Sequence, residues 1–136
     1  MVRSIMRDPL FLSRRSVQAT KADIQIGMDL LQTLMSYQDE CVGMAANMIG
    51  ELKNIIAINN DGMFMLMYNP MIVAKSGKYE TEEGCLSLAG IRRTTRYERI
   101  RVSFQDAGFR TVTAEFTGFT AQIIQHEVDH CNGILI

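Results

Sequence analysis

The two histidines of this chain lie four residues apart, in the segment Gln125-His126-Glu127-Val128-Asp129-His130. If this segment is helical, residues i and i+4 lie on one face one turn apart, so both imidazoles can bind one metal ion. The glutamate beside the first histidine is then placed to act as a base on water bound to that metal. The spacing predicts a metal-dependent hydrolase. The competing interpretation, a solvent-facing helix with two chance histidines, is weakened because the chain is short and has no other histidine.

A catalytic site of this kind needs a third protein ligand and one open coordination position. Only six residues follow His130, so we expect the third ligand upstream. Cys131 points about 100° away from His130 on a helix, which favours a buried thiol there. Cys41 and Cys85 remain, and Cys85 follows a glycine that permits close backbone approach. A thiolate would give a Cys-His-His site that tolerates Fe(II) as well as Zn(II).

Composition excludes several classes of function. The chain has 136 residues, which predicts one domain over 1–136. Its net charge is −1, with 14 basic and 15 acidic residues, so there is no electrostatic case for direct binding of nucleic acid or an anionic membrane. No apolar run approaches the ~20 residues that span a bilayer. The chain has three cysteines, and an odd number argues against a disulfide framework. We therefore expect a reducing compartment, the cytoplasm.

Apolar residues recur at helical spacing over 21–39, which predicts an amphipathic helix there, after irregular chain over 1–20. Thr20 and Asp23 resemble a capping box at its start. A second helix is expected over 119–131, closed by Asn132-Gly133.

Between these helices we expect antiparallel strands, with a turn at Asn60-Asp61-Gly62 and a break at Asn69-Pro70. The expected strands cover 52–59, 63–68, 71–74, 99–105 and 111–116. The order helix, strands, helix predicts an α+β domain in which antiparallel sheets pack around the HExxH helix.

Three motifs together resemble the peptide deformylase family. Glu83-Gly84-Cys85-Leu86-Ser87 and the HExxH segment each match a family motif in full, in the family's order and separation. The segment Cys41-Val42-Gly43-Met44-Ala45-Ala46-Asn47-Met48 is similar to a third motif, Gly-x-Gly-x-Ala-Ala-x-Gln. Asp8-Pro9-Leu10, and Arg96 with the strand after it, extend the similarity to most of the chain.

The resemblance implies a compact α+β fold, a metal and a reaction. The reaction removes the formyl group from the initiator methionine of new bacterial peptides and releases formate. It implies N-formylmethionyl peptides as substrates, with the ribosome exit region as a further partner and the bacterial cytoplasm as the location. The metal would be Fe(II) in the cell, replaceable by Zn(II), Ni(II) or Co(II).

The resemblance also implies roles for individual residues. It assigns the metal to Cys85, His126 and His130. Glu127 would take a proton from water on the metal and pass it to the leaving amine. The Leu86 N–H would help to hold the developing oxyanion. An extended peptide would pair as an added strand along a groove lined by Val42, Gly43 and Gly84.

Two positions depart from the family pattern. Cys41 replaces the first glycine of the third motif, and we expect it to be a buried small side chain; near Cys85, oxidation would join the two thiols. Met48 replaces the closing glutamine, whose amide donates to the oxyanion in the family, and methionine cannot donate a hydrogen bond. Loss of one such donor costs about 10²–10³ in turnover in other hydrolases.

Three interpretations of Met48 follow: hydrolysis at a reduced rate, a shifted substrate, or a metal-binding homologue that binds peptide with little turnover. The complete ligand set and base favour retained hydrolysis. A zinc peptidase is a further alternative, but it rests on HExxH alone.

Overall fold

The computed structural model describes residues 1–136, which form three α-helices, two short 3₁₀ helices and five strands. In chain order these are α1 (Pro9–Leu12), η1 (Lys21–Asp23), α2 (Ile24–Ser36), β1 (Gly43–Ala45), η2 (Ala46–Ile49), β2 (Ile55–Asn60), β3 (Met63–Gly84), β4 (Ile91–Gln105), β5 (Thr111–Thr117) and α3 (Gly118–Cys131).

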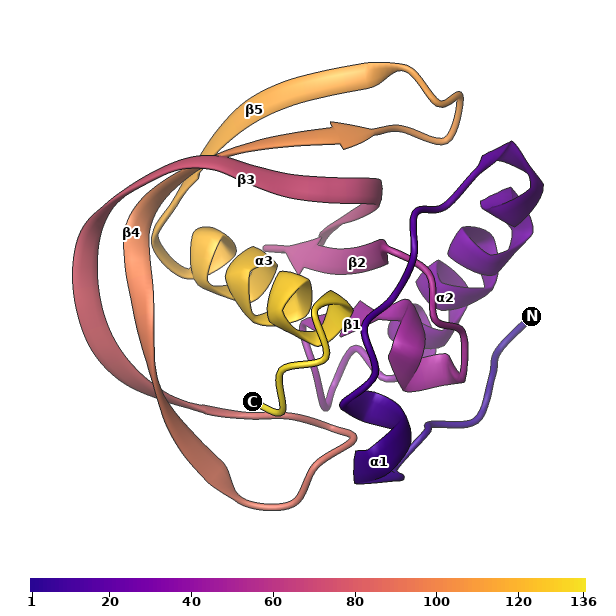
Figure 1. Ribbon diagram of the computed structural model, residues 1–136, viewed down its shortest axis with the longest axis horizontal. Coiled ribbons are helices and arrows are strands. Elements are labelled where there is room, and N and C mark those ends of the chain that lie inside the picture. The colour runs from indigo at the N-terminus through magenta and orange to yellow at the C-terminus, as the bar shows by residue number, and fades with distance from the viewer.

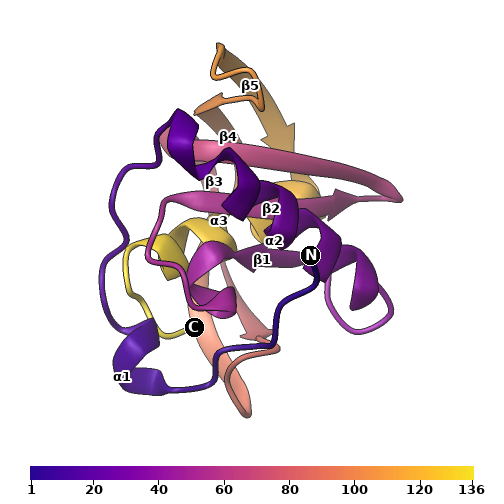
Figure 2. The same ribbon diagram turned by 90° about the vertical axis from the view of Figure 1, so that its right-hand side faces the viewer.

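The five strands form one antiparallel sheet in the order β1-β2-β3-β4-β5. The long strands β3 and β4 curve around α3, while α2 lies on the other side of β1 and β2 (Figures 1 and 2). The predicted α+β fold around the HExxH helix is therefore confirmed, with one curved sheet in place of several.

Strand β2 is buried on both faces and holds the two helical layers together. Successive side chains of a strand point to opposite faces. Ile56 and Ile58 belong to the apolar cluster that packs against α3, whereas Ile55 and Ala57 belong to the cluster that packs against α2. All four are fully buried, and each buried isoleucine contributes roughly 1.5–3 kcal/mol. The continuous apolar run in this strand is thus explained by helices on both sides.

The predicted break at Asn69-Pro70 is wrong, because β3 continues through it. The register of the β3–β4 pairing shifts between Tyr68 and Met71. Asn69 takes a positive φ of 53°, and its side chain is held by Ala19, whose N–H donates to it at 2.7 Å. A bulge accommodates proline within a strand and bends the sheet. The irregularity therefore turns β3 around α3 instead of ending it.

The predicted helices form with small differences in their bounds. The helix predicted over 21–39 starts with the 3₁₀ turn η1 and ends at Ser36, and the Asp23 carboxylate accepts from the Thr20 N–H at 2.8 Å. The HExxH helix is confirmed. Residues 1–20 are not wholly irregular, because the Asp8 side chain caps α1 by accepting from the Leu10 N–H.

No helix has both the length and the apolar character needed to cross a membrane.

The contact between Gly27 and Tyr68 generates a prediction about stability. A Cβ at Gly27 would lie 2.1 Å from the Tyr68 hydroxyl oxygen, which donates to the Ile24 carbonyl at 2.7 Å and sits on a fully buried ring. Overpacking costs about 1–3 kcal/mol, against a gain of about 1 kcal/mol in helix propensity. We expect Gly27→Ala to lower the free energy of unfolding, measured in urea, by up to about 2 kcal/mol.

The matched control is Gly108→Ala, where the nearest atom to the new Cβ lies 3.4 Å away in a surface turn. This variant should stay within about 0.5 kcal/mol of the wild type. An increase in stability in Gly27→Ala would contradict the prediction.

Candidate metal-dependent active site

Helix α3 brings the two histidines and the glutamate of HExxH to the inside of the curved sheet. It begins at Gly118, which has a positive φ of 61° directly after β5. His126, Glu127 and His130 are all buried on this helix. The two imidazoles lie one turn apart with their Nε2 atoms 3.0 Å from each other. The predicted helical spacing is thus realised at the centre of the molecule.

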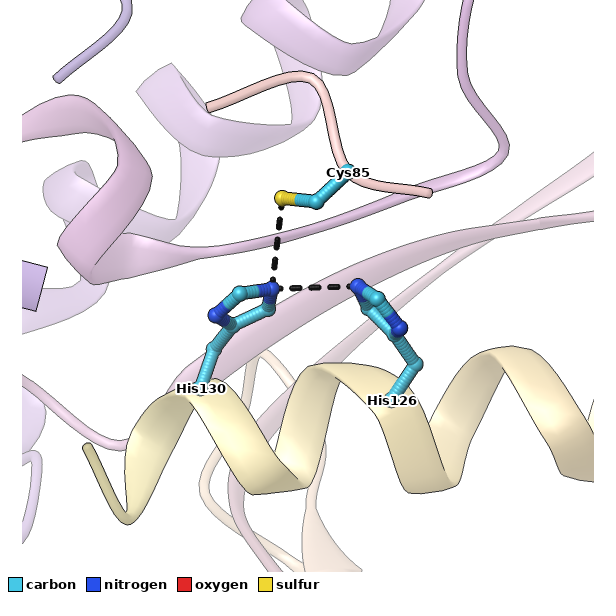
Figure 3. A group of neighbouring side chains, drawn as sticks. All are labelled: Cys85, His126 and His130. Atoms are coloured by element: carbon cyan, nitrogen blue, oxygen red, sulfur yellow. Dashed lines mark hydrogen bonds between the residues drawn. The ribbon is translucent and has the colours of Figure 1, made fainter. Parts of the chain in front are cut away.

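Cys85 approaches the same point from the loop that follows β3. Its Sγ lies 3.3 Å from the His130 Nε2, and Figure 3 shows the thiol pointing at the two rings from the opposite side of the site. The three potential ligand atoms lie within 4.8 Å of one another. Cys131 is buried and does not belong to this group. The structure therefore brings together the three predicted ligand residues and leaves out the rejected cysteine.

The three side chains fit a divalent metal ion. The Glu83 carboxylate, which can only accept, lies 2.8 Å from the His126 Nδ1, so Nδ1 carries the proton and Nε2 presents its lone pair to the site. Two imidazole nitrogens and a thiolate sulfur are ligands that both Fe(II) and Zn(II) accept. The donor set fits such an ion and does not distinguish between the two metals.

The pKa values of the two facing rings shift in opposite directions. Burial disfavours charged His126, but its interactions with Cys85 and Glu83 outweigh burial and raise the pKa of His126 to about 10. Burial and the charge of His126 lower the pKa of His130 to about 3. The two facing rings therefore hold one proton between their Nε2 atoms, and a bound metal ion would displace it, because a ligating imidazole must present its lone pair.

Glu83 organises the surroundings of these ligands. Besides His126, its carboxylate accepts from the Arg96 guanidinium at 2.7 and 2.9 Å and from the Gln122 amide at 2.9 Å. Burial favours a neutral Glu83, but the hydrogen bonds from His126, Arg96 and Gln122 outweigh it and hold the pKa of Glu83 at about 2. Arg96 also donates to Asp129 at 2.7 Å. An ionised carboxylate therefore orients the His126 ring.

Glu127 faces the cavity beside the ligands and is 4% exposed. Its Oε1 has no hydrogen-bond partner in the protein. Burial raises the pKa of Glu127 to about 7, although the charge of His126 acts in the opposite direction. A carboxyl group with a pKa near neutrality is suited to accept and return a proton. A free oxygen beside the ligands gives Glu127 the position of a general base.

Strand β1 passes directly over Glu127 because it carries a glycine. A Cβ at Gly43 would lie 2.9 Å from the Glu127 Oε2 and 2.7 Å from the Ile123 side chain. No side chain fits between the strand and the helix at this point. β1 also forms one edge of the sheet, since β2 is its only partner strand. The free edge of β1 thus lies at the cavity that holds Glu127.

The cavity measures about 690 Å³ and gathers almost all of the predicted site residues. The predicted residues among its lining are Val42, Gly43, Met48, Gly84, Cys85, Leu86, His126 and Glu127. His130 is fully buried behind them and reaches the site through its contacts with Cys85 and His126. The Leu86 N–H donates no hydrogen bond within the protein, so it is free to bind a ligand.

Two residues that depart from the family pattern also line this cavity. The Met48 side chain is buried and turns back on its own chain, where its Sδ accepts from the Ala45 N–H at 3.4 Å. It offers no donor to the site. Cys41 is only partly buried, and burial raises the pKa of its thiol to about 12, which disfavours a reactive thiolate.

Sequence reasoning missed the roles of Glu83, Arg96, Gln122 and Asp129. Glu83 and Asp129 lie inside the motifs that were singled out, so their presence there was an available signal. Arg96 and Gln122 meet Glu83 only because the β3–β4 hairpin closes onto α3. That meeting is a property of the fold and has no local pattern in the sequence.

Comparison with known proteins agrees with this site. The polypeptide deformylase family model matches residues 2–136. The chain is 48% identical to a peptide deformylase of Clostridium beijerinckii over 136 residues, the full length of both. It is 35% identical over 133 residues to one of Halothermothrix orenii, covering 94% of this chain and 85% of the relative.

Solved structures give the same result for the fold. The peptide deformylase of Thermotoga maritima matches with a TM-score of 0.88 at 27% identity, covering 99% of this chain and 95% of that one. A class I type b peptide deformylase of Acinetobacter baumannii with Met-Ala-Ser bound also matches with a TM-score of 0.88 at 27% identity, covering 99% and 97%. The chain therefore belongs to the polypeptide deformylase family, whose members remove N-formyl groups in a metal-dependent reaction.

Proposed function

We propose that this protein removes the formyl group from the N-terminal methionine of newly made peptides and releases formate, using Cys85, His126 and His130 as metal ligands and Glu127 as base. The observation that carries the proposal is the convergence of one sulfur and two imidazole nitrogens within 4.8 Å, beside a buried carboxyl group with a free oxygen. Membership of the family supports it. No observation favours an inactive homologue.

The ion that we propose for the cell is Fe(II), with Zn(II), Ni(II) or Co(II) able to replace it. The mixed sulfur and nitrogen ligand set supports an ion of this type. When bound, such an ion supplies Lewis acidity, which polarises the formyl carbonyl and makes water a nucleophile at neutral pH.

Glu127 moves the proton in this proposal. Its unpartnered Oε1 accepts a proton from the attacking water, and the same carboxyl group then donates that proton to the amine that leaves. The pKa of about 7 supports both steps, since the group changes its protonation state readily near neutral pH. Its burial keeps bulk water away from the exchanged proton.

The oxyanion that develops on the formyl oxygen is assigned to the Leu86 N–H. This donor lines the cavity and has no partner in the protein. Met48 supplies no second donor, because its sulfur only accepts. We therefore propose that the enzyme works with a weaker oxyanion site than the family pattern provides.

An extended peptide is proposed to bind along the free edge of β1, with Val42 and Gly43 on one side and Gly84 on the other. Backbone pairing at a sheet edge is tolerant of sequence, which suits a substrate that varies after its first residue. The cavity beside Glu127 would take the methionine side chain. Formylated termini arise on nascent chains, so the proposed setting is the bacterial cytoplasm, near the ribosome exit.

Formate release from formyl-Met-Ala-Ser tests the proposed function, with protein prepared without oxygen and loaded with Fe(II) or Ni(II). The Met-Ala-Ser complex of the Acinetobacter baumannii enzyme motivates the peptide. Turnover with one metal ion per chain would support the proposal. A metal-loaded protein that leaves the peptide intact at high enzyme concentration would contradict it.

The first prediction about the proposed site concerns the base. Glu127→Ala should lower turnover by at least about 10²-fold, because no other group is placed to carry the proton. Metal content, measured by atomic emission, should not change. Glu115→Ala removes an exposed carboxylate on β5 and should leave both quantities unaltered. Full activity in Glu127→Ala would remove Glu127 from this role.

A second prediction concerns the missing oxyanion donor. Met48→Gln should raise kcat, by up to about 10²-fold, because the glutamine oxygen can accept from the Ala45 N–H as sulfur does while its amide donates into the cavity. Met48→Leu has a similar volume without donor or acceptor and should show no gain. Unchanged kcat in Met48→Gln would mean that a second donor is not limiting.

A third prediction concerns the carboxylate behind His126. Glu83→Gln leaves the Arg96 charge without its buried partner, so the free energy of unfolding should fall by about 3–5 kcal/mol. Affinity for Zn(II), measured by competition with a chelator, should fall about 10–100-fold. The neighbouring Glu82→Gln removes an exposed carboxylate 4.0 Å from Arg93 and should change neither. Equal effects of the two variants would contradict the assignment.

A further inference from the structure

Residues 3–7, here called the N-terminal strap, connect parts of the molecule that are far apart in the sequence. The strap runs from α2 toward α1 and passes the loop between β3 and β4 (Figure 2). Hydrogen bonds hold the strap in place. Arg3 donates to Asp29 of α2 at 2.9 Å, and the Met6 N–H donates to the Met48 carbonyl at 2.7 Å. Arg7 donates to the carbonyl of Leu86, in the loop between β3 and β4, at 2.6 Å. The strap thus bridges both sides of the proposed oxyanion site.

The loop over residues 85–90 has few hydrogen bonds of its own. The Leu88 N–H reaches the Cys85 carbonyl at 3.3 Å, and Arg92 donates to the Ala89 carbonyl at 3.2 Å. Both distances exceed the usual 2.9–3.0 Å. The bond from the Arg7 guanidinium to Leu86 is the shortest on this loop, and its donor comes from outside the hairpin. Arg7 is therefore the main backbone anchor of the loop.

Leu86 has one backbone group that is fixed and one that is free. Arg7 holds its carbonyl, while its N–H has no acceptor in the protein, and the residue as a whole lines the cavity. A charged donor makes a shorter and stronger bond than a neutral one. The carbonyl and the N–H of Leu86 lie in the two peptide planes on either side of its Cα, so fixing the carbonyl limits the φ and ψ rotations that would turn the N–H. The direction of the free N–H is restricted along with it.

We propose that Arg7 is a positioning residue for deformylation, holding the Leu86 carbonyl so that the Leu86 N–H stays directed at the developing oxyanion. The inference rests on the proposed function. The strap lies outside the three family motifs, and the inference gives it a role in the reaction. Because Met48 cannot share the oxyanion, turnover depends on the orientation of the single Leu86 donor, and hence on Arg7.

The kinetic test compares Arg7→Met, Arg7→Lys and Arg15→Met, all loaded with the same metal. Arg15 is an exposed arginine that follows α1, and its side chain makes no hydrogen bond or ion pair. Arg7→Met should lower kcat about three- to tenfold, the value of one net hydrogen bond, with KM changed by less than about twofold. Arg7→Lys should recover part of the loss. An unchanged kcat in Arg7→Met, or an equal loss in Arg15→Met, would overturn the inference.

A double variant separates positioning from general stability. In the Met48→Gln background a second donor shares the oxyanion, so Arg7→Met should cost less than it does in the wild type. A loss of stability or of metal would reduce turnover by the same factor in both backgrounds. Equal losses would therefore assign Arg7 a purely structural role and refute the proposal.

A measurement without substrate distinguishes failure of this inference from failure of the proposed function. In Zn(II)-loaded protein labelled with ¹⁵N-leucine, Arg7→Met should increase the mobility of the Leu86 amide in relaxation measurements, whereas Arg15→Met should not. If the wild type fails to release formate, the proposed function is wrong, and the amide still reports whether Arg7 holds Leu86. An equally rigid Leu86 amide in Arg7→Met would show that it does not.

Discussion

Glu83 and Arg96 form a buried ion pair in which both carboxylate oxygens accept from one guanidinium group. Burying two charges is costly, and the pair is tolerated because its remaining hydrogen-bonding capacity is used. The carboxylate also bonds to His126 and Gln122, and the guanidinium to Asp129. The pair thus joins the end of β3, the middle of β4 and two turns of α3, which are the elements that form the metal site.

The position of the ion pair explains why the ligands meet. Glu83 precedes Cys85 by two residues, so the strand end that fixes His126 also delivers the sulfur ligand. The bulge after Tyr68 bends β3, and the end of this strand then reaches α3 across from β1 (Figure 1). Gly43, in turn, lets β1 approach Glu127 without a side chain between them. The curved sheet therefore encloses the helix and holds the proposed ligand Cys85 and the proposed base Glu127 from two directions.

The sequence predicts the chemistry of this site better than its architecture. HExxH places two ligands and a base by helical geometry alone, and elimination among the cysteines leaves Cys85 as a candidate. The strand predicted over 99–105 from its alternating apolar residues, among them Ile100 and Val102, also forms, although β4 begins eight residues earlier, at Ile91. These features depend on neighbours in the sequence, which is why local patterns reveal them.

Features that depend on distant contacts were missed. β1 has three residues, too few for a periodicity, and it forms because Met44 pairs with Ala57 of β2. β3 was divided at Pro70, because a proline in a strand normally ends it, whereas pairing with β4 and the Asn69 contacts carry the strand onward. The partners of Glu83 were missed for the same reason, since only the closed hairpin brings Arg96 beside it.

The two halves of the site are held by different forces. The ligand half is fixed by buried charges that satisfy one another, so losing Glu83 or Arg96 leaves its partner as an unpaired charge in the interior. The oxyanion half is formed by the Leu86 N–H, by the exposed hydrogen bond from Arg7 and by Met48, none of which carries a buried charge. A glutamine can therefore be replaced by methionine in this half without disturbing the metal ligands or the base. We therefore expect the methionine at position 48 to affect the rate of the proposed reaction, while the fold, the proposed metal site and the nature of the chemistry are preserved.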